Sequence, residues 1–282
     1  MEIEKAQETG FCFGVKRAID ILENAVKTRG NIQTLGAVVH NEQVTSRLAG
    51  IGITPINDIS EINDNAVAIS SHGIPPELEK KLKEKKVEII DTTCPFVLRA
   101  QAAARRLSEA GFFTVVFGDY SHPEVKGILG CTDGKGTAAL SVDELQESLK
   151  NEKHIGILSQ TTQIPENFTS FSSKMVQRML DKDSEIRLID TICHDIRKRQ
   201  AVSLELSHRV DMMIVVGGSA SANTRRLFEL CSQITEAHHV ETADQIDESW
   251  IKGKKRIGVT SGTSTPPEVI DDVVRYLENV NY

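Results

Sequence analysis

Three cysteines stand in matching sequence settings, and three thiols brought together could hold a metal. Cys12 lies in "ETGFCFGVKRAI", Cys94 in "DTTCPFVLRAQ" and Cys193 in "DTICHDIRKRQ". Each follows a predicted strand ("EKAQ", "VEIID" or "IRLID") and precedes a predicted helix, whose N-terminus favours the thiolate over the thiol. Parallel α/β folds place functional residues at such strand ends, so three packed copies of one unit would bring the cysteines to a common centre.

Polar residues recur at fixed distances from the same cysteines. Adding 28 to each cysteine's number gives His40, His122 and Ser221, and adding 30 gives Glu42, Glu124 and Asn223. A third polar turn precedes a Pro-Glu pair in "SHGIPPE", "TTQIPE" and "GTSTPPE", and these turns contain His72, Thr161 and Ser264. The shared flanks, offsets and order favour a triplicated unit over a chance likeness.

Iron–sulfur chemistry suits three thiolates better than structural zinc does. Structural zinc normally takes four ligands, often in Cys-x-x-Cys pairs, and the chain has no such pair. A 4Fe–4S cluster normally takes four cysteines, so three would leave one iron open to a substrate oxygen and able to pass electrons to it. The alternative is a set of buried core thiols. That alternative suits Cys131, which has no counterpart in the other copies, and Cys231, on the apolar face of a predicted helix.

The polar turns are suited to bind a phosphate or a diphosphate. One predicted ring around the centre comprises His40, His122 and Ser221, and a second comprises His72, Thr161 and Ser264. Imidazole and hydroxyl groups before helices attract anions together with the free N–H groups of the helix N-termini. The chain has no GxxxxGK[ST] or GxGxxG pattern, which argues against nucleoside triphosphates and dinucleotides. A lone histidine is more often structural, and we assign that role to His154, His194, His208, His238 and His239.

Glu124 lies two residues after His122, in "SHPEV". We expect its surroundings to be negatively charged and partly desolvated, and a carboxyl group in such surroundings can keep a proton and deliver it near neutral pH. The simpler alternative is a surface carboxylate at the start of a helix.

The elements that position these residues alternate along the chain. Predicted strands are "IQTLG", "AVAIS", "VEIID", "FTVVFG", "IGILSQ", "IRLID", "MMIVVGG" and "RIGVTSG", with amphipathic segments between them. This order is typical of βαβ units and parallel sheets. We expect an α/β fold of three pseudo-threefold-related α/β units with mostly parallel sheets (a trefoil) around a central iron–sulfur cluster. The expected units are 13–94, 95–190, and 191–282 together with 1–12.

Composition narrows the class of protein. The chain has 282 residues, of which 39% are hydrophobic and 26% charged, and a net charge of −7, which argues against nonspecific nucleic-acid binding. The charged start "MEIEKAQETG" lacks the apolar core of a signal peptide, and no apolar run is long enough to span a membrane. We therefore expect a cytoplasmic protein, where cysteines rarely form disulfides.

Several motifs together resemble one family, the 4-hydroxy-3-methylbut-2-enyl diphosphate reductases (the IspH/LytB family), last enzymes of the methylerythritol phosphate route to isoprenoids. The motifs are "GFCFGVKRAI", "HNEQV", "SSHGIPP", "DTTCP", "SHPEVKGILG", "SQTT", "DTIC…RQ", "NTRRL" and "TSGTSTP". The resemblance covers essentially the whole chain. It implies a trefoil of three α/β domains with a central 4Fe–4S cluster that has one open iron and three ligands, Cys12, Cys94 and Cys193.

The same resemblance implies roles for the polar residues. The residues that correspond to diphosphate ligands are His40, His72, Ser221, Asn223 and Ser264. His122 and Thr161 would line the pocket at the allylic end of the substrate, and Glu124 would be the proton source. The implied reaction removes the hydroxyl of (E)-4-hydroxy-3-methylbut-2-enyl diphosphate as water and yields isopentenyl or dimethylallyl diphosphate, with electrons from a reduced ferredoxin or flavodoxin.

Three other functions remain open from the residues alone. Quinolinate synthase resembles this layout, with three α/β units and three cysteines around a cluster, but its open iron acts as a Lewis acid. "SHPEV" and "TSGTSTP" favour the reductase. A zinc enzyme with three thiolates and a water is the second alternative. A phosphate-binding module without chemistry is the third, and it would leave the matched cysteines without a purpose.

The chain departs from the family pattern at two positions. Many members have "SSN" where this chain has "SAN", with Ala222 in the second place, so one hydroxyl donor is missing. After Cys193 the family often has threonine at the third position, where this chain has Ile196. The second departure puts a polar contact of that turn in doubt but not the cluster.

Restoring the missing hydroxyl should strengthen substrate binding. We predict that Ala222→Ser makes the binding free energy of the diphosphate substrate more negative by about 0.5–1.5 kcal/mol, the value of one added hydrogen bond. Titration calorimetry on both proteins measures the change. An unchanged dissociation constant would show that the hydroxyl is redundant.

Overall fold

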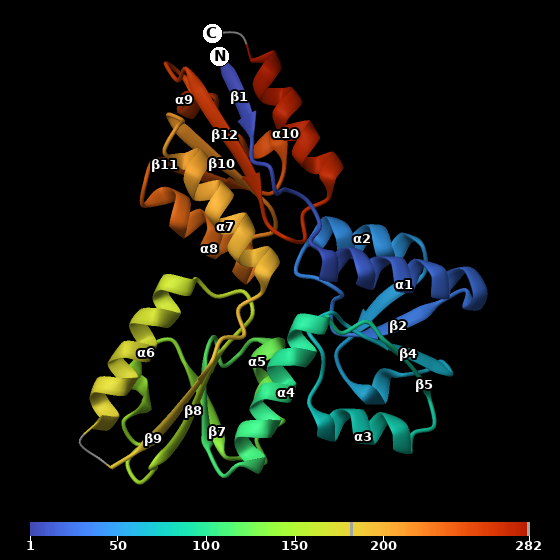
Figure 1. Cartoon of the computed structure of the whole chain (residues 1–282). Coiled ribbons are helices and arrows are strands. Elements are labelled where there is room, and N and C mark those ends of the chain that lie inside the picture. The colour runs from blue at the N-terminus through green and yellow to red at the C-terminus, as the bar shows by residue number, and fades with distance from the viewer. Residues whose placement is uncertain (181–182, 281–282) are drawn as a thin grey trace. The chain divides into compact units, whose positions relative to one another are not determined.

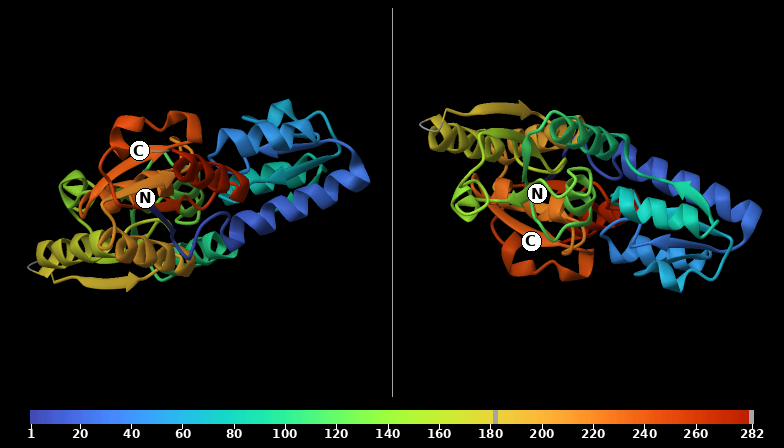
Figure 2. Two further views of the ribbon diagram at one scale, coloured as in Figure 1. Left: turned by 90° about the horizontal axis from the view of Figure 1, so that it is seen from above. Right: turned by 90° about the horizontal axis from the view of Figure 1, so that it is seen from below.

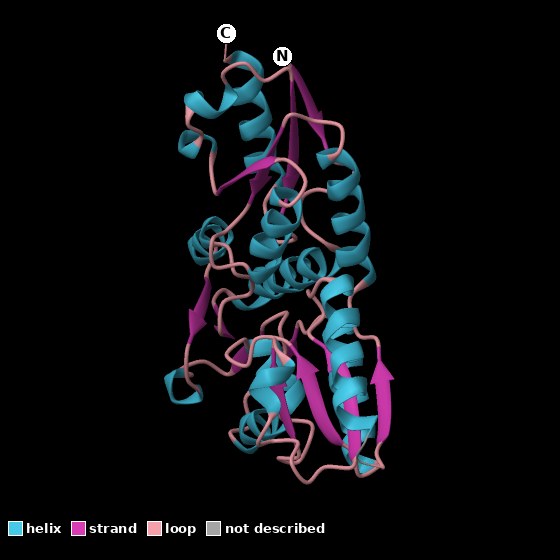
Figure 3. Ribbon diagram, turned by 90° about the vertical axis from the view of Figure 1, so that its left-hand side faces the viewer, coloured by secondary structure: helices cyan, strands magenta, loops and turns pink. Residues whose placement is uncertain are grey.

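Parallel sheets form the frame of the molecule in the computed structural model, which describes residues 1–180 and 183–280. Within these residues there are three sheets of four strands each, and every pairing between strands is parallel. The arrows of the sheet at the lower right of Figure 3 accordingly point the same way. The expected α/β class with three parallel-sheet units is confirmed.

The first sheet contains β2 (Ile32–Leu35), β3 (Ile53–Ile56), β4 (Ala66–Ile69) and β5 (Glu88–Asp91). The same part of the chain carries α1 (Phe13–Arg29), α2 (Glu42–Gly50), the 3-10 turn η1 (Ile59–Glu61) and α3 (Pro76–Glu84). All residues of the inner strand β4 are buried, whereas Pro55 in β3 and Asp91 in β5 are exposed at the two edges. Proline is tolerated at an edge because no neighbouring strand needs its N–H.

The second sheet contains β6 (Phe113–Phe117), β7 (Gly136–Ala139), β8 (His154–Ser159) and β9 (Glu185–Ile189). The helices and turn of this part are α4 (Pro95–Glu109), α5 (Pro123–Leu129), η2 (Val142–Leu145) and α6 (Pro165–Met179). Leu107 of α4 packs so closely on β8 that a Cβ at Gly156 would lie 2.6 Å from its Cδ1 atom. Phe117 stacks on Phe168 of α6, with ring centroids 5.9 Å apart.

The third sheet combines β10 (Met212–Val216), β11 (Glu236–Val240) and β12 (Arg256–Ser261) with the N-terminal strand β1 (Glu2–Lys5). Its other elements are α7 (His194–Ser207), α8 (Ala222–Ser232), η4 (Ala243–Gln245), α9 (Glu248–Ile251) and α10 (Pro267–Asn279). Strand β1 pairs with β12 and lies against α10, so the two ends of the chain complete one unit (Figures 1 and 2). Met213 and Leu206 pack on one face of the sheet, and Ile214 and Leu277 pack on the other.

One topology occurs three times. The strand orders are β3-β2-β4-β5, β7-β6-β8-β9 and β11-β10-β12-β1. In each sheet the last strand of the order leads to one of the three matched cysteines (Figure 1). The three parts of the chain are called repeats below, in the order in which their sheets were described.

Contacts between residues divide the chain into two compact units, which are described separately. Compact unit 1 comprises 1–16, 39–52 and 194–282, and it contains the third sheet. Compact unit 2 comprises 17–38 and 53–193, and it contains the first and second sheets. In the described ranges, no helix has both the length and the apolar character needed to cross a membrane.

Each sheet has one strand that the sequence did not predict. These strands are β3, β7 and β11, each at the edge of its sheet far from the cysteine. Their sequences "ITPI", "GTAA" and "EAHHV" contain proline, glycine or polar residues in place of a β-branched run. The segment predicted as "EKAQ" is also displaced, because β1 ends at Lys5.

The packing of α10 on the third sheet generates a test of the fold. Leu277 is fully buried there, so we predict that Leu277→Ala lowers the free energy of unfolding by about 2–5 kcal/mol, the usual cost of such a cavity. Denaturant unfolding measures the change. The exposed neighbour Glu278, changed to alanine as a control, should cost less than about 0.5 kcal/mol. Equal effects of both substitutions would contradict the packing.

Candidate functional site

The three matched cysteines share one local geometry. Each lies at the start of a helix that follows an edge strand, and its backbone N–H donates to a carbonyl oxygen two residues beyond the end of the neighbouring strand. The pairs of nitrogen and oxygen are Cys12 to Thr263 at 3.0 Å, Cys94 to Ser71 at 3.0 Å and Cys193 to Thr161 at 2.9 Å. Each polar turn found in the sequence therefore lies beside one cysteine. No disulfide joins any of the five cysteines.

Glu124 and Thr161 form a buried pair in compact unit 2. Only 2% of Glu124 is exposed. Its Oε1 accepts the backbone N–H of Thr161 at 2.7 Å, and its Oε2 accepts the Thr161 hydroxyl at 3.0 Å. The carbonyl of Thr161 in turn accepts the N–H of Cys193. One cysteine and one carboxyl group are thus linked through a single threonine.

His122 extends this set of contacts toward the first sheet. As the N-cap of α5, its Nδ1 accepts the backbone N–H of Glu124 at 3.2 Å, so a neutral ring carries its proton on Nε2. The rings of His122 and His72 meet edge to face, with centroids 5.5 Å apart. His72 directly follows Ser71, whose carbonyl accepts the N–H of Cys94. Compact unit 2 therefore brings together six predicted site residues, namely His72, Cys94, His122, Glu124, Thr161 and Cys193.

In compact unit 1, the segment before Cys12 is bound to the turn that follows β12. The Gly10 N–H donates to the Ser261 hydroxyl at 2.9 Å, two residues before the bond from Cys12 to Thr263. Arg199 of α7 donates to the carbonyl oxygens of Gly10 and Ser261, both at 2.9 Å. These hydrogen bonds hold the segment that contains the predicted ligand Cys12 against the predicted anion-binding turn around Ser264.

Burial raises the pKa of the Cys12 thiol, and three groups oppose this effect. They are, in order of size, the N–H of Val15, the guanidinium of Arg199 and the N–H of Gly14. Two of the three are N–H groups from the first turn of α1, as expected for a helix N-terminus. The Cys12 thiol therefore lies where a positively charged binding partner would favour its thiolate form.

The N-terminus of α8 offers polar groups without a partner among the described residues. Ser221 is the N-cap, and its Oγ accepts the backbone N–H of Thr224 at 3.3 Å, which leaves its hydroxyl hydrogen available to an acceptor. Nδ2 of Asn223 and Oγ1 of Thr224 are buried and make no hydrogen bond to the described part of the chain. Asn223 is only 5% exposed, as is Ser264. Buried donors of this kind need a partner, and an anion would provide one.

His40 lies beside this helix start, within the same compact unit. The backbone of Gly218 packs on it so closely that a Cβ there would lie 2.8 Å from the His40 carbonyl oxygen. Asn41 caps α2 by accepting the N–H of Val44 at 3.1 Å. Burial, with a smaller effect from the charge of Arg225, lowers the pKa of His40, so its imidazole is neutral at pH 7. Compact unit 1 thus contains Cys12, His40, Ser221, Asn223 and Ser264.

The remaining cysteines and two of the remaining histidines have structural surroundings. Cys131 and Cys231 are buried in hydrophobic clusters, as expected, and burial raises the pKa of both thiols. His154 meets Phe112 with ring centroids 5.7 Å apart, and His238 stacks on Trp250 at 3.9 Å.

Arg199 was not predicted as a site residue from the sequence. It lies six residues after Cys193, where the other two repeats have Ala18 and Ala100. A charged residue at a position that is alanine in both related copies was a visible signal. The prediction rested on residues that the repeats share, and this signal is a difference between them.

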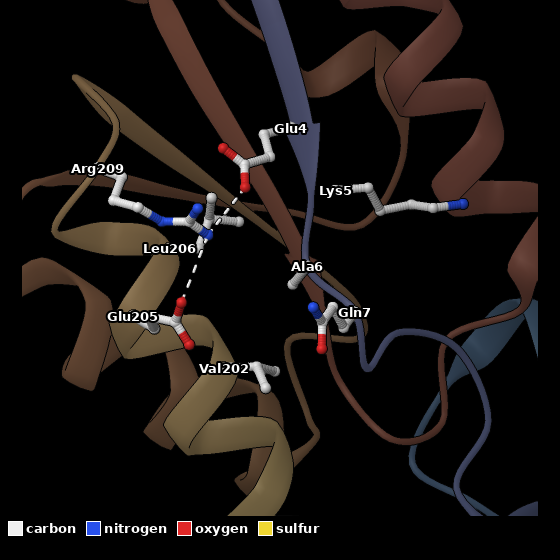
Figure 4. Close-up of a pocket in the computed structure, with 8 residues that line it drawn as sticks. All are labelled: Glu4, Lys5, Ala6, Gln7, Val202, Glu205, Leu206 and Arg209. Carbon is white, nitrogen blue, oxygen red and sulfur yellow. Dashed lines mark ion pairs between the residues drawn. The ribbon is translucent and has the colours of Figure 1, made fainter.

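A surface hollow in compact unit 1 is unrelated to these residues. It has a volume of about 140 Å³ and lies between β1 and α7 (Figure 4). Arg209 extends into it and pairs with Glu4 at 2.9 Å and with Glu205 at 3.9 Å. Lys5 also lines the hollow but pairs with Asp271 outside it, so each of these charged groups has a partner, and no predicted site residue lines the hollow.

Comparison with known sequences points to one family. The family model described as "LytB protein" matches residues 3–278. A protein of Dehalococcoides mccartyi (strain CBDB1) is 52% identical over 281 residues, which is 100% of this chain and 99% of the relative. A protein of Aquifex aeolicus (strain VF5) is 37% identical over 285 residues, with 99% of this chain and 97% of the relative covered. Both relatives are named 4-hydroxy-3-methylbut-2-enyl diphosphate reductase.

Two solved structures are similar over nearly the whole chain. One is of an (E)-4-hydroxy-3-methyl-but-2-enyl diphosphate reductase, described as the terminal enzyme of the non-mevalonate pathway. It is 36% identical, with a TM-score of 0.73, and the match covers 99% of this chain and all of that one. The other is a reductase from Plasmodium falciparum, 26% identical with a TM-score of 0.89, and the match covers 99% of this chain and 88% of that one.

The pair of Glu124 and Thr161 can be tested through stability. We predict that Thr161→Val lowers the free energy of unfolding by about 1–3 kcal/mol, because it removes the hydroxyl that donates to a buried carboxyl oxygen. Thr161→Ser is the matched control, since it keeps the hydroxyl. Denaturant unfolding of both variants measures the difference. A valine variant as stable as the serine variant would contradict the pairing.

Proposed function

The chain belongs to the LytB protein family, and from this premise we propose that it reduces (E)-4-hydroxy-3-methylbut-2-enyl diphosphate to isopentenyl and dimethylallyl diphosphate. This is the terminal step of the non-mevalonate route to isoprenoids. The observation that carries the proposal is the full-length likeness to reductases that bear this name, at up to 52% identity. The reaction consumes two electrons and two protons, breaks the bond between carbon and the terminal hydroxyl, forms a C–H bond and releases one water.

We propose one 4Fe–4S cluster as the cofactor, with Cys12, Cys94 and Cys193 as its three ligands. The donor set fits this group, because three thiols recur at helix N-termini in one backbone geometry. When bound, the cluster would supply electrons and one iron without a protein ligand. Cys131 and Cys231 are excluded from the proposed set, since both lie in hydrophobic clusters.

The diphosphate end of the substrate is assigned to imidazole, hydroxyl and amide groups. The proposed ligands are His40, His72, Ser221, Asn223 and Ser264. Support comes from the buried amide of Asn223, which has no partner among the described residues, and from the N-terminus of α8 behind it. A helix N-terminus and convergent donors bind a phosphate oxygen without a lysine or arginine in contact.

Glu124 is the proposed proton donor, with Thr161 and His122 as its catalytic partners. Only 2% of Glu124 is exposed, so the proposed proton donor is shielded from bulk water. Thr161 holds both carboxyl oxygens, so their direction is determined before the substrate arrives. His122 is held by its Nδ1 atom, so Nε2–H is the ring donor that we assign to a substrate oxygen.

Further assignments extend this proposal. Reduced ferredoxin or flavodoxin is the proposed electron donor, and the cytoplasm is the proposed location. We also propose three domains at 13–94, 95–190, and 191–282 with 1–12, because each of these ranges holds one complete sheet.

A reductant-dependence assay tests the function against its nearest alternative. We expect purified, anaerobically prepared enzyme to convert the diphosphate substrate only when reductant is supplied, with two electrons consumed per product. Analysis of iron and sulfide in the same preparation separates a cluster from zinc. Turnover without reductant would favour Lewis-acid chemistry of the quinolinate synthase kind. A single zinc with no sulfide would favour the zinc enzyme, and either result would overturn the proposal.

The role of Glu124 generates a separate prediction. Glu124→Gln has nearly the same shape but cannot deliver a proton, so we expect turnover to fall at least about 100-fold, the usual contribution of a positioned acid. The visible spectrum of the cluster should stay unchanged. The matched control is Glu166→Gln, at the exposed first turn of α6, which should keep full activity. Full activity in the Glu124 variant would remove this residue from the mechanism.

A further inference from the structure

Arg199 is a buried cation with no carboxylate in contact among the described residues. It is 4% exposed. Besides its bonds to the carbonyl oxygens of Gly10 and Ser261, Nη1 lies 3.2 Å from the Ser261 hydroxyl and 3.4 Å from the Gly262 carbonyl oxygen. All of these partners are neutral, and its Nε has no hydrogen-bond partner in the described part of the chain. A buried charge is costly, so a position that keeps one needs a reason.

The equivalent positions in the other two repeats show that helix packing alone does not require a charged residue here. Six residues after the cysteine, the first and second repeats have Ala18 and Ala100, and both are fully buried. A helix can therefore pack at this position with a small apolar residue. Only the third repeat has a guanidinium at this buried position. The arginines one position earlier in the other two repeats, Arg17 and Arg99, also donate to carbonyls ahead of a matched cysteine, those of Thr93 and Asp190, but they are partly or fully exposed.

The fork of Arg199 joins two segments that are far apart in the sequence. One segment leads from Gly10 to Cys12, and the other leads from Ser261 to the turn around Ser264. Two terminal nitrogens in a rigid plane hold both at once, which a single ammonium group could not do in the same way. The arginine therefore helps to hold the segment of the proposed cluster ligand beside the proposed diphosphate turn, together with the bonds from Gly10 to Ser261 and from Cys12 to Thr263.

The charge of Arg199 also acts on Cys12, two residues beyond the Gly10 carbonyl to which Arg199 donates. Burial lowers the pKa of Arg199, and the largest opposing effect comes from Cys12, ahead of Glu8 and Asp195. Arginine stays protonated in proteins under all ordinary conditions. A positive charge close to an iron–sulfur ligand stabilises the more negative, reduced form of a cluster, because net charge and nearby dipoles help to set its potential.

We propose that Arg199 is a positioning residue that also acts electrostatically. It fastens the Cys12 segment to the turn around Ser264, and its buried charge raises the reduction potential of the group held by Cys12. This inference rests on the proposed function, since it presupposes a cluster at Cys12. In this proposal, the third repeat controls the reduction potential of the cluster.

The two roles are separated by two substitutions. Arg199→Lys keeps the charge and loses the fork, whereas Arg199→Gln loses both the charge and most of the fork. Ser261→Ala is the control, because it removes two hydrogen bonds of the same tether without a change of charge. Each protein is prepared anaerobically with its cluster, and two quantities are measured: the midpoint potential in a mediated redox titration, and the rate at which a chelator removes iron.

The proposal predicts a distinct pattern. The midpoint potential should fall in the glutamine variant and stay at the wild-type value in the lysine and Ser261 variants. Iron loss should be several-fold faster in both Arg199 variants.

A loaded glutamine variant with the wild-type potential would overturn the inference while leaving the proposed function intact. If the glutamine variant holds no cluster, the lysine variant decides: a wild-type potential supports the inference, and a lost cluster or a shifted potential overturns it. A wild-type protein without any cluster would instead overturn the proposed function.

Discussion

One backbone hydrogen bond, made three times, positions the residues to which we assign the chemistry of this molecule. The N–H of each matched cysteine donates to a carbonyl just beyond the end of the neighbouring parallel strand. Because parallel strands end at the same edge of a sheet, this bond places a thiol, a polar turn and a helix N-terminus side by side. Each sheet therefore places the same three groups together: a thiol, a polar turn and a helix N-terminus. The side chains of the turns can then vary without loss of the frame.

The three repeats use this freedom in different ways. The second repeat places a histidine and a buried carboxyl where the third has Ser221 and Asn223. The second can therefore handle a proton, whereas the third offers neutral donors that suit an anion. Arg199 continues the same divergence, since a charge replaces an alanine. A substrate with a hydroxyl at one end and a diphosphate at the other needs unlike partners, which an exactly symmetric site could not offer.

The sequence was most informative where one residue type had one physical role. β-branched runs predicted three strands in each of the first two sheets and two in the third, and the spacing from Cys12, Cys94 and Cys193 predicted the polar turns. The outer strands β3, β7 and β11 could not be predicted, because a short edge strand with Pro55 or polar residues carries no alternating pattern. The contacts of Arg199 could not be predicted either, because they join Gly10 to Ser261, which are separated by most of the sequence.

The central claim is that three thiolates hold four irons and leave one iron without a protein ligand. Mössbauer spectroscopy of the protein loaded with ⁵⁷Fe tests this claim most directly, because it distinguishes irons with different ligands. On addition of the diphosphate substrate, the signal of one iron in four should change while the other three stay the same. A spectrum in which no iron responds, or in which all four irons have protein ligands, would contradict the account.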